Sequence, residues 1–485
     1  MALVSISYNA GINYTSPVDD YSPARLYPEY LFEKILLGEN HVYELIRGCL
    51  HHYGADKEHY DTSIWNPLGQ WVNKGDRVFI LPNLVSHRRP FQSNIDFMGT
   101  CIHGSILRTL LDYVFIATGT SGIVSVGNAP LQECDYDKVT KETGIVNVAE
   151  FFRRINGHNI GPYDLRIVKT LWSLFGTVLL ERREQNTSDA VYIDLGKDSL
   201  LDELFDKSGR PVEVRVADYD GRETMSYHTV GKHIYVVNRR ILESDIIISL
   251  PKLKTHEKVG VTCALKGAVG SIARKECLAH HRRGAPTENG DEYPKSTRMH
   301  DLVSHSLDLA SQGGRDFIGN AIRFASKVGY RLLRAGKQGV MGGAWYGNDT
   351  SWRMTLDIQR ILRYARPDGT MSDLPQRKHI ALVDGIVSGE GDGPLKPRAK
   401  NTGVVLFSSD ICAVDYVAAL TMGFDVSSIP LINNAFKSMR WPLTDIQPTD
   451  IQFLLNGNTL NTEDLKERLN FHFVPPKGWV GHIEI

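Results

Sequence analysis

Cysteine is scarce in this chain and is not arranged in pairs. The six cysteines among 485 residues are irregularly spaced, and no two of them form a CxxC motif. This pattern argues against a disulfide framework, a zinc knuckle and a cysteine-ligated iron–sulfur cluster, which need regularly spaced cysteines. We therefore expect no iron–sulfur cluster and a reducing, cytoplasmic environment. The cysteines are Cys49, Cys101, Cys134, Cys263, Cys277 and Cys412.

Two other absences limit the partners of the chain. Its 55 lysines and arginines nearly balance its 56 aspartates and glutamates, and the formal net charge of -1 gives no overall field to attract nucleic acid or an anionic membrane. The chain has no run of about 18 uninterrupted apolar residues, and its first residues lack the basic and apolar regions of a signal peptide. We expect a soluble protein without a nucleic-acid or membrane partner, and the oligomeric state is left open.

Short apolar runs that alternate with helical patterns begin near Asp76. Most runs are continuous and β-branched, as in strands that are buried on both faces of a sheet. We predict an α/β fold with a mostly parallel sheet flanked by helices, and a division into two lobes with a site between them is left open. Predicted strands span residues 77–81, 123–126, 191–195, 233–237, 245–250, 379–383 and 404–407, and predicted helices include residues 105–117 and 411–420.

The composition also divides the chain into three parts. Residues 1–75 are polar and aromatic and are predicted to form a cap of helix and loop, residues 76–440 form the α/β core, and residues 441–485 form a C-terminal extension. Within the core, residues 281–350 are charged and rich in turns, so we interpret them as a loop-rich insertion. Such long loops often serve as lids or binding segments, and a surface insertion without function is the alternative.

The segment of residues 244–281 concentrates titratable side chains where a predicted strand ends. Four lysines with few carboxylates follow this strand, namely Lys252, Lys254, Lys258 and Lys266. Open α/β sheets bind ligands at the carboxyl ends of their strands, so these lysines are candidates for binding a carboxylate or phosphate. A solvated run of surface charge is the alternative. His256 lies among these cations, which favour its neutral form, and it is the candidate acid/base.

Other loops that follow predicted strands add polar groups to the same expected edge of the sheet. The further candidates for substrate binding are Asn83, Asn128, Gln132 and His103. His103 precedes a predicted helix, and a role at the helix start is its alternative. Glu390 and Asp392 lie in a glycine-rich acidic loop, where carboxylates can transfer a proton, bind a cation or pair with the lysines. Asp415, on the predicted helix 411–420, is a further catalytic candidate.

Two adjacent histidines near the end of the segment are candidates for binding a divalent metal. His280 or His281 can supply an imidazole ligand, and Asp392 can supply a carboxylate. A single sequence does not identify the remaining ligands of a zinc or nickel site, and a charged helix end is the alternative. The residue types therefore leave the metal and any other cofactor undetermined.

Six sequence blocks in the same order resemble domain-of-unknown-function family 362 over about residues 76–434. The blocks are LPNLV at 81–85, GNAPLQ at 127–132, LPKLKTH at 250–256, ALKG at 264–267, EGDGP at 390–394 and SDICAVD at 409–415. The resemblance implies a bacterial and archaeal family in which some members also have a cysteine-rich, ferredoxin-like module. This chain lacks those cysteines, in keeping with the expectation of no cluster.

Residues 244–281 also resemble, more distantly, a segment of the nickel-pincer lactate racemases. In both, a strand leads to a histidine, a lysine follows ten residues later, and another histidine comes further on. This resemblance implies that His256 exchanges a proton, that Lys266 holds a cofactor or a substrate carboxylate, and that His280 or His281 binds a metal. Here residues 257–262 replace the tyrosine- and glycine-rich turn of the racemases, and the later histidine is offset by a residue or two.

Two functions of different classes follow from these observations. The first is an enzyme of racemase or epimerase type that acts on a small anionic metabolite by proton transfer. Its catalytic candidates are His256, Lys266, Glu390 and Asp415. The second is a binding or accessory protein that holds such a metabolite without catalysis. Substitution of His256 separates the two, because loss of turnover with retained binding supports the enzyme.

Overall fold

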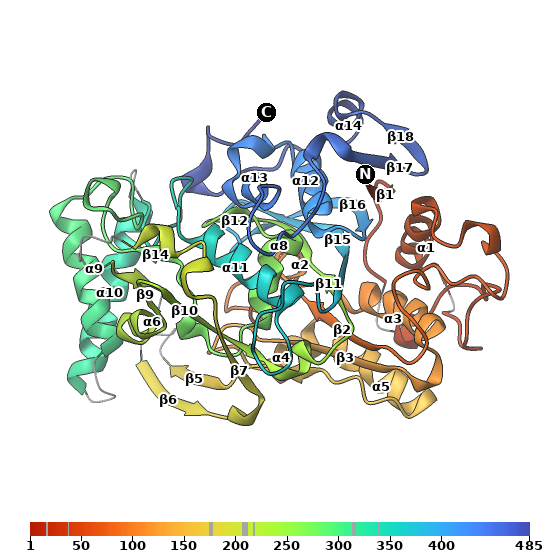
Figure 1. Cartoon of the computed structure of the whole chain (residues 1–485), viewed down its shortest axis with the longest axis horizontal. Helices are drawn as coiled ribbons and strands as arrows, with labels where there is room; N and C mark the ends of the chain where they lie inside the picture. The colour runs from red at the N-terminus through yellow and green to blue at the C-terminus, as the bar shows by residue number, and fades with distance from the viewer. Residues whose placement is uncertain are drawn as a thin grey trace.

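The structure of the chain is a computed structural model that describes residues 1–15, 18–36, 38–173, 178–205, 212–216, 219–312, 317–336 and 339–485. A mostly parallel sheet passes through the centre, and helices cover both of its faces (Figure 1). Within the described ranges, eleven strands belong to this sheet. The predicted α/β fold class is confirmed.

The main sheet is parallel in one half and largely antiparallel in the other. From edge to edge its strands are β18 (Asn458–Leu460), β17 (Ile451–Leu455), β1 (Ala2–Tyr8), β16 (Arg398–Ser408), β15 (Lys378–Glu390), β11 (Ile246–Leu250), β2 (Arg77–Pro82), β3 (Ile123–Asn128) and β4 (Tyr163–Asp164). All neighbours from β15 to β4 are parallel, whereas β16 is antiparallel to both β15 and β1. Beyond Pro251, β12 (Lys252–His256) continues along β15 and also pairs with β13 (Gly260–Val261).

The continuous apolar sequence of β11 is explained by burial on both faces. Ile246 and Ile248 pack into the hydrophobic cluster of one face, and Ile247 packs into the cluster of the other. The register places Val78 and Ile80 of β2 beside Ile246 and Ile248. Because successive side chains of a strand point to opposite faces, a strand covered on both sides needs an apolar residue at every position.

Three longer helices cover one face of the sheet, and three others cover the opposite face. The first set is α1 (His41–Tyr53), α3 (Gly104–Thr118) and α5 (Ile145–Asn156), and the second is α8 (Cys263–Gly267), α11 (Ser351–Tyr364) and α12 (Ile411–Met422). The remaining described α-helices are α2 (Asn94–Met98), α4 (Tyr136–Glu142), α6 (Gly221–Tyr227), α7 (Arg239–Leu242), α9 (Arg298–Gln312), α10 (Phe317–Ala335), α13 (Pro430–Ala435) and α14 (Thr462–Arg468). In the part of the chain that the structure describes, none of the helices has the length and apolar character to cross a membrane.

Two predicted strands form a separate sheet instead of joining the main one. Residues 191–195 and 233–237 correspond to β7 (Ala190–Asp194) and β10 (Lys232–Asn238), which pair antiparallel, with β9 (His228–Thr229) beside β10. Their apolar residues pack with Phe79 and Ile247 of the main sheet. Two further pairs are β8 (Val214–Arg215) with β14 (His281–Arg282), and β5 (Val168–Ser173) with β6 (Val178–Glu184).

The segments on either side of the predicted core both contribute to the main sheet. From the predicted cap, β1 lies between β16 and β17, and from the predicted extension, β17 and β18 form one edge. The predicted insertion 281–350 contains α9 and α10, which pack on each other at one end of the molecule, opposite α1 (Figure 1). The predicted loop-rich insertion therefore contains two helices of 15 and 19 residues.

Candidate functional site

A cavity of about 190 Å³ lies where three strands of the main sheet end. Asn83 directly follows β2, Asn128 is the last residue of β3, and His256 is the last residue of β12. Parallel strands bring their carboxyl ends to one edge of a sheet, which explains why positions so distant in sequence meet there. Five of the predicted site residues line this cavity, namely Asn83, Asn128, His256, Lys266 and His280.

Asp415 positions the helix on which Lys266 lies. Its carboxylate accepts hydrogen bonds from the backbone N–H groups of Ala264, at 2.7 Å, and Leu265, at 2.8 Å, at the start of α8. Unpaired N–H groups at a helix start need such acceptors. Burial raises the pKa of Asp415 to about 7. Asp415 does not line the cavity, so its place in the structure is that of a positioning residue.

Three lysines line the cavity, and their amines differ in hydrogen bonding. The Nζ atom of Lys258 donates to the carbonyl of Gly342, and that of Lys275 donates to the carbonyl of Val269 at 3.0 Å. The Nζ atom of Lys266 is buried without a hydrogen-bond partner among the described residues. Burial, followed by the charges of Lys258 and Lys275, lowers the pKa of Lys266 to about 7. A substantial fraction of this amine is therefore neutral at neutral pH.

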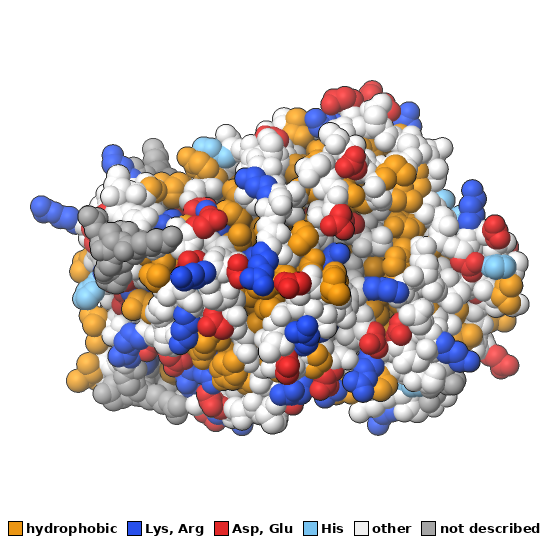
Figure 2. All heavy atoms as spheres, viewed as in Figure 1, with side chains coloured by type: hydrophobic (Ala, Val, Ile, Leu, Met, Phe, Trp, Pro, Cys, Tyr) orange, Lys and Arg blue, Asp and Glu red, His pale blue; other side chains and the backbone are white. Residues whose placement is uncertain are grey.

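The cavity wall contains more basic than acidic side chains. Besides the three lysines, Arg89 lines it, and the carboxylates in its wall are those of Glu133 and Glu257. Glu257 forms an ion pair with Arg334 at 2.8 Å, so its charge is already balanced. On the face shown in Figure 2, side chains of both signs are interspersed. The side chains that line the cavity are therefore more often basic than acidic.

His256 is a neutral imidazole in this setting. Burial, followed by the charges of Lys266 and Lys258, lowers its pKa well below the usual value. Its Nδ1 atom accepts a hydrogen bond from the backbone N–H of Lys258 at 3.1 Å. The neutral ring therefore has its proton on Nε2, where it can donate to a ligand.

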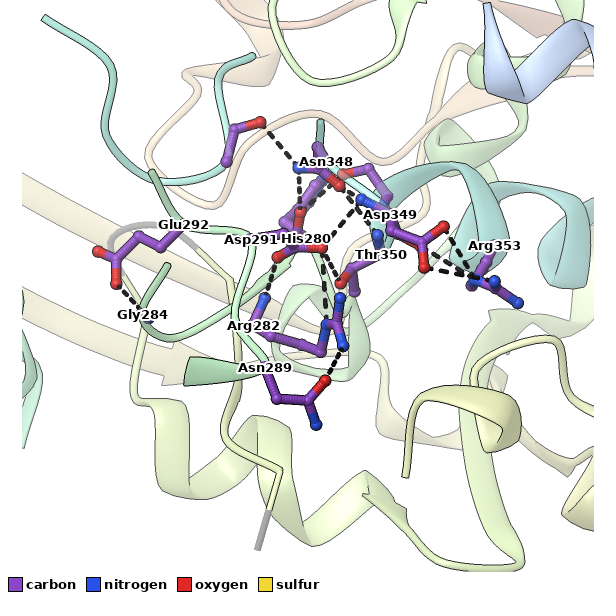
Figure 3. Close-up of polar contacts among 12 residues, drawn as sticks. His280, Arg282, Gly284, Asn289, Asp291, Glu292, Asn348, Asp349, Thr350 and Arg353 are labelled. Carbon is purple, nitrogen blue, oxygen red and sulfur yellow. Dashed lines mark hydrogen bonds and ion pairs between the residues drawn. The ribbon is translucent and has the colours of Figure 1, made fainter. Parts of the chain in front are cut away.

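His280 is held in place through its backbone. Its carbonyl oxygen accepts hydrogen bonds from Asn348 Nδ2 at 2.9 Å and Ser351 Oγ at 2.8 Å, near the start of α11. Figure 3 shows Asn348 and Thr350 beside it, and Asp291 accepts from the hydroxyl of Thr350 at 2.6 Å. Desolvation, followed by the charge of Lys266, lowers the pKa of His280 well below the usual value.

The adjacent histidines line different cavities. His280 lines the cavity described above, whereas His281, on β14, lines a second cavity beside α9 and α10. The described residues contain no group of three or more histidine, cysteine or acidic side chains that could hold a metal ion. The charges that lower the pKa of His280 most are those of Lys266 and Lys258, and such cations disfavour a divalent cation beside it. The residues around His280 and His281 therefore do not fit the metal site that the racemase resemblance implies.

Two asparagines and a glutamine add polar groups near the strand ends. Asn128 Nδ2 donates to the carbonyl of Pro82 at 2.7 Å, which leaves its Oδ1 atom without a partner among the described residues. The Oδ1 atom of Asn83 also lacks one. At Gly270 any side chain would collide with the Asn128 amide, so this approach requires glycine. Gln132 is buried, and its side-chain amide has no hydrogen-bond partner within the described part of the chain, but it does not line the cavity.

Lys252 and Lys254 lie within the sheet and not in a loop. The predicted end of the strand at Leu250 is the end of β11, but the loop expected after it is a second strand, β12, which pairs with β15. Lys252 forms an ion pair with Asp384 at 3.0 Å, and Lys254 donates to the carbonyl of Thr100. Both lysines are fully buried, and neither lines the cavity.

The acidic loop at the end of β15 binds the C-terminal segment. Glu390 forms an ion pair with Lys400 at 2.9 Å and accepts from the backbone N–H of Val474 at 3.0 Å. Asp392 accepts from the backbone N–H of Lys477 at 2.9 Å. Neither carboxylate lines the cavity. Their contacts join two distant segments of the chain.

His103 caps α3, as its alternative interpretation expects. Its Nδ1 atom accepts from the backbone N–H of Ser105 at 3.3 Å, and its ring stacks on Tyr14 with centroids 4.2 Å apart. Burial lowers the pKa of His103 to about 3. It lines a separate cavity next to Cys101.

Lys275 is a site residue that the sequence reasoning missed. It follows Lys266 by nine residues within the same segment of small residues, and this spacing was the available signal. Burial lowers its pKa to about 7. Its contribution to the cavity depends on the short turns between α8 and β14, which no simple periodicity reveals.

Comparison with known proteins identifies the family of the chain. The sequence model described as Domain of unknown function (DUF362) matches residues 177–420, which are 244 of the 485 residues. This range contains His256, Lys266 and His280. Searches of curated proteins and of solved structures gave no match. The resemblance predicted from the sequence blocks is thus confirmed, and the chain belongs to the DUF362 family.

Proposed function

We propose that this protein is an enzyme that exchanges a proton at a carbon of a small anionic metabolite, as racemases and epimerases do. The main support is one arrangement: Lys266, without an acceptor for its amine among the described residues, shares a cationic cavity with the neutral imidazoles of His256 and His280. The six cysteines are free and buried, which fits the cytoplasmic location that we propose with this function.

The substrate class follows from the charge of the cavity. Lys258 places positive charge in its wall, and Lys275, with a pKa of about 7, adds a charge that is present in part at neutral pH; each has a backbone acceptor that fixes its amine. Fixed cations bind a carboxylate or a phosphate with little loss of side-chain entropy. The cavity volume of about 190 Å³ suits a metabolite of few heavy atoms.

Proton exchange needs a proton acceptor and a group that stabilises the negative charge left on the substrate. The neutral ring of His256 has its proton on Nε2, because its Nδ1 atom is occupied by the N–H of Lys258, and it can donate a hydrogen bond to a substrate oxygen as that charge develops. His280 is neutral, and its Nδ1 atom has no partner among the described residues. It is therefore the candidate acceptor. When Lys266 is protonated, its charge lowers the pKa of both rings further than burial alone does.

The alternative is a protein that binds the same anion without catalysis. The lysines of the cavity would attract an anion in either case, so binding alone does not separate the two functions. The most informative substitutions are in the cavity, at Lys275 and His256, and not at Lys252 or Lys254, whose amines are bonded elsewhere.

The test is hydrogen exchange in deuterated water. The full chain is incubated with a panel of small 2-hydroxy acids, 2-oxo acids and sugar phosphates, and NMR follows the loss of carbon-bound protons. We expect exchange in at least one compound, its loss in His256→Gln, and its retention in His305→Gln, since His305 is exposed on α9. If a compound raises the melting temperature but no compound exchanges, the binding alternative is correct.

A further inference from the structure

Lys266 differs from the other two lysines of the cavity in having no acceptor among the described residues. The amines of Lys258 and Lys275 each donate to a backbone carbonyl, and this acceptor holds each amine in the cavity wall. Lys266 is only 5% exposed, and its amine is buried. A buried charge without a hydrogen-bond partner raises the free energy of the folded protein. The favourable state of Lys266 is a neutral amine with an available lone pair.

The surroundings of Lys266 keep this amine in a defined place. Asp415 binds the first N–H groups of α8, and α8 contains Lys266 near its end. Gln359 Nε2 donates to the carbonyls of Ala264 and Leu265, at 3.1 and 2.9 Å, so the short helix is also held from α11. A nucleophile benefits from such positioning, because less entropy is lost when it reaches the reacting carbon.

We propose that Lys266 is a nucleophile that forms a Schiff base with the carbonyl carbon of a small oxo acid or oxo phosphate. This inference rests on the proposed function and narrows its substrate class to anions with a ketone or aldehyde group. The anionic part would lie near the amino groups of Lys258 and Lys275. The carbonyl carbon would lie at the amine of Lys266.

The chemistry is balanced without an additional reagent. The lone pair of Nζ attacks the carbonyl carbon, a C–N bond forms, and one proton of the attacking nitrogen moves to the oxygen to give a carbinolamine. The Nε2–H of His256 donates a hydrogen bond to this hydroxyl, which takes up a proton from solvent and leaves as water, while nitrogen forms the C=N double bond. The resulting iminium withdraws electrons from the neighbouring carbon, so a proton on that carbon can move to His280 and return.

The experiment is reductive trapping on the full chain. The protein is incubated with sodium cyanoborohydride and either pyruvate, which has a carboxylate, or dihydroxyacetone phosphate, which has a phosphate. Intact mass and peptide mapping then locate any reduced adduct. We expect one adduct per chain, on Lys266, with at least one probe, and the preferred probe identifies the anionic group. Lys266→Arg should reduce the adduct by at least ~10-fold, and Lys295→Arg, at an exposed position, should not change it.

The outcomes separate this inference from the proposed function. The inference is overturned if neither probe gives an adduct. It is also overturned if the adduct forms on Lys258 or Lys275 in place of Lys266. If deuterium still enters a hydroxy acid in that case, the proposed function stands without the Schiff base. If the adduct forms on Lys266 but no proton exchanges on its neighbouring carbon, the Schiff base stands and the proposed function fails. The mapping on the unmodified protein gives a result even if Lys266→Arg does not fold.

Discussion

Replacement of Lys266 by methionine should make the protein more stable, although it removes a proposed active-site group. The amine is buried without a partner among the described residues, and its pKa falls from the ordinary 10.5 to about 7. Each pKa unit corresponds to about 1.4 kcal/mol, so the charged amine costs the folded state on the order of 5 kcal/mol. Methionine has a similar volume, and its packing loss is about 1 kcal/mol. We therefore expect a net gain of roughly 4 kcal/mol near neutral pH.

The pH dependence of this gain follows from the two pKa values. Below pH 7 the amine is protonated in both the folded and the unfolded chain, so the full cost is present. Between pH 7 and 10.5 only the unfolded chain binds the proton, and the folded state becomes relatively more stable as the pH rises. Above pH 10.5 the amine is neutral in both states. The advantage of Lys266→Met should therefore be largest at or below pH 7 and disappear towards pH 10.5.

Urea unfolding of both proteins at several pH values measures this difference. Tryptophan fluorescence reports the transition, and the difference in free energy of unfolding is taken at each pH. Lys295→Met, at an exposed position, is the control and should change the stability by less than about 0.5 kcal/mol. A Lys266→Met protein that is less stable than the original at pH 7, or a difference that does not vary with pH, would refute the reasoning.

Four further predictions concern the residues around the cavity. Lys252→Met should destabilise the fold by about 3 kcal/mol or more in urea unfolding, because it leaves the buried carboxylate of Asp384 without its cation; an unchanged midpoint would contradict this. Asp415→Asn should cost about 1–2 kcal/mol, since an amide nitrogen cannot accept the N–H of Ala264 or Leu265, and should lower the yield of the pyruvate adduct; a full yield would show that α8 does not need this contact. His256→Gln should slow deuterium exchange by about 100-fold or more while phosphate still raises the melting temperature, and a parallel loss of both would favour a structural role. The yield of the trapped adduct should rise with pH through about 7, where Lys266 loses its proton, and an increase only near pH 10 would mean an unperturbed lysine.

The strands and the general position of the site could be predicted from local pattern. β-branched runs such as Ile246–Leu250 are apolar at successive positions because both faces of the strand are covered, and this is visible in sequence. Parallel strands also bring their ends together by geometry. Asn83, Asn128 and His256 could therefore be expected at one edge without knowledge of the pairing.

The hydrogen-bond and ion-pair partners of individual charged residues could not be predicted from local sequence pattern. Lys252 and Lys266 look alike in sequence, yet one forms an ion pair with Asp384, 132 positions away, and the other has no acceptor among the described residues. Asp415 was expected in catalysis and instead holds the start of α8. Such contacts join elements that are far apart in the chain, so no local periodicity encodes them.

The sequence by itself determined the α/β class, the family and the segment that contains His256, Lys266 and His280, because these depend on local pattern and spacing. Only the tertiary structure decided which lysines form hydrogen bonds or ion pairs and which amine has no acceptor among the described residues. It also placed β1, β17 and β18 in the main sheet, and it placed His280 and His281 in the walls of different cavities. The physical reason is that burial and hydrogen bonding depend on which elements pack together, and that packing sets the pKa of each buried group.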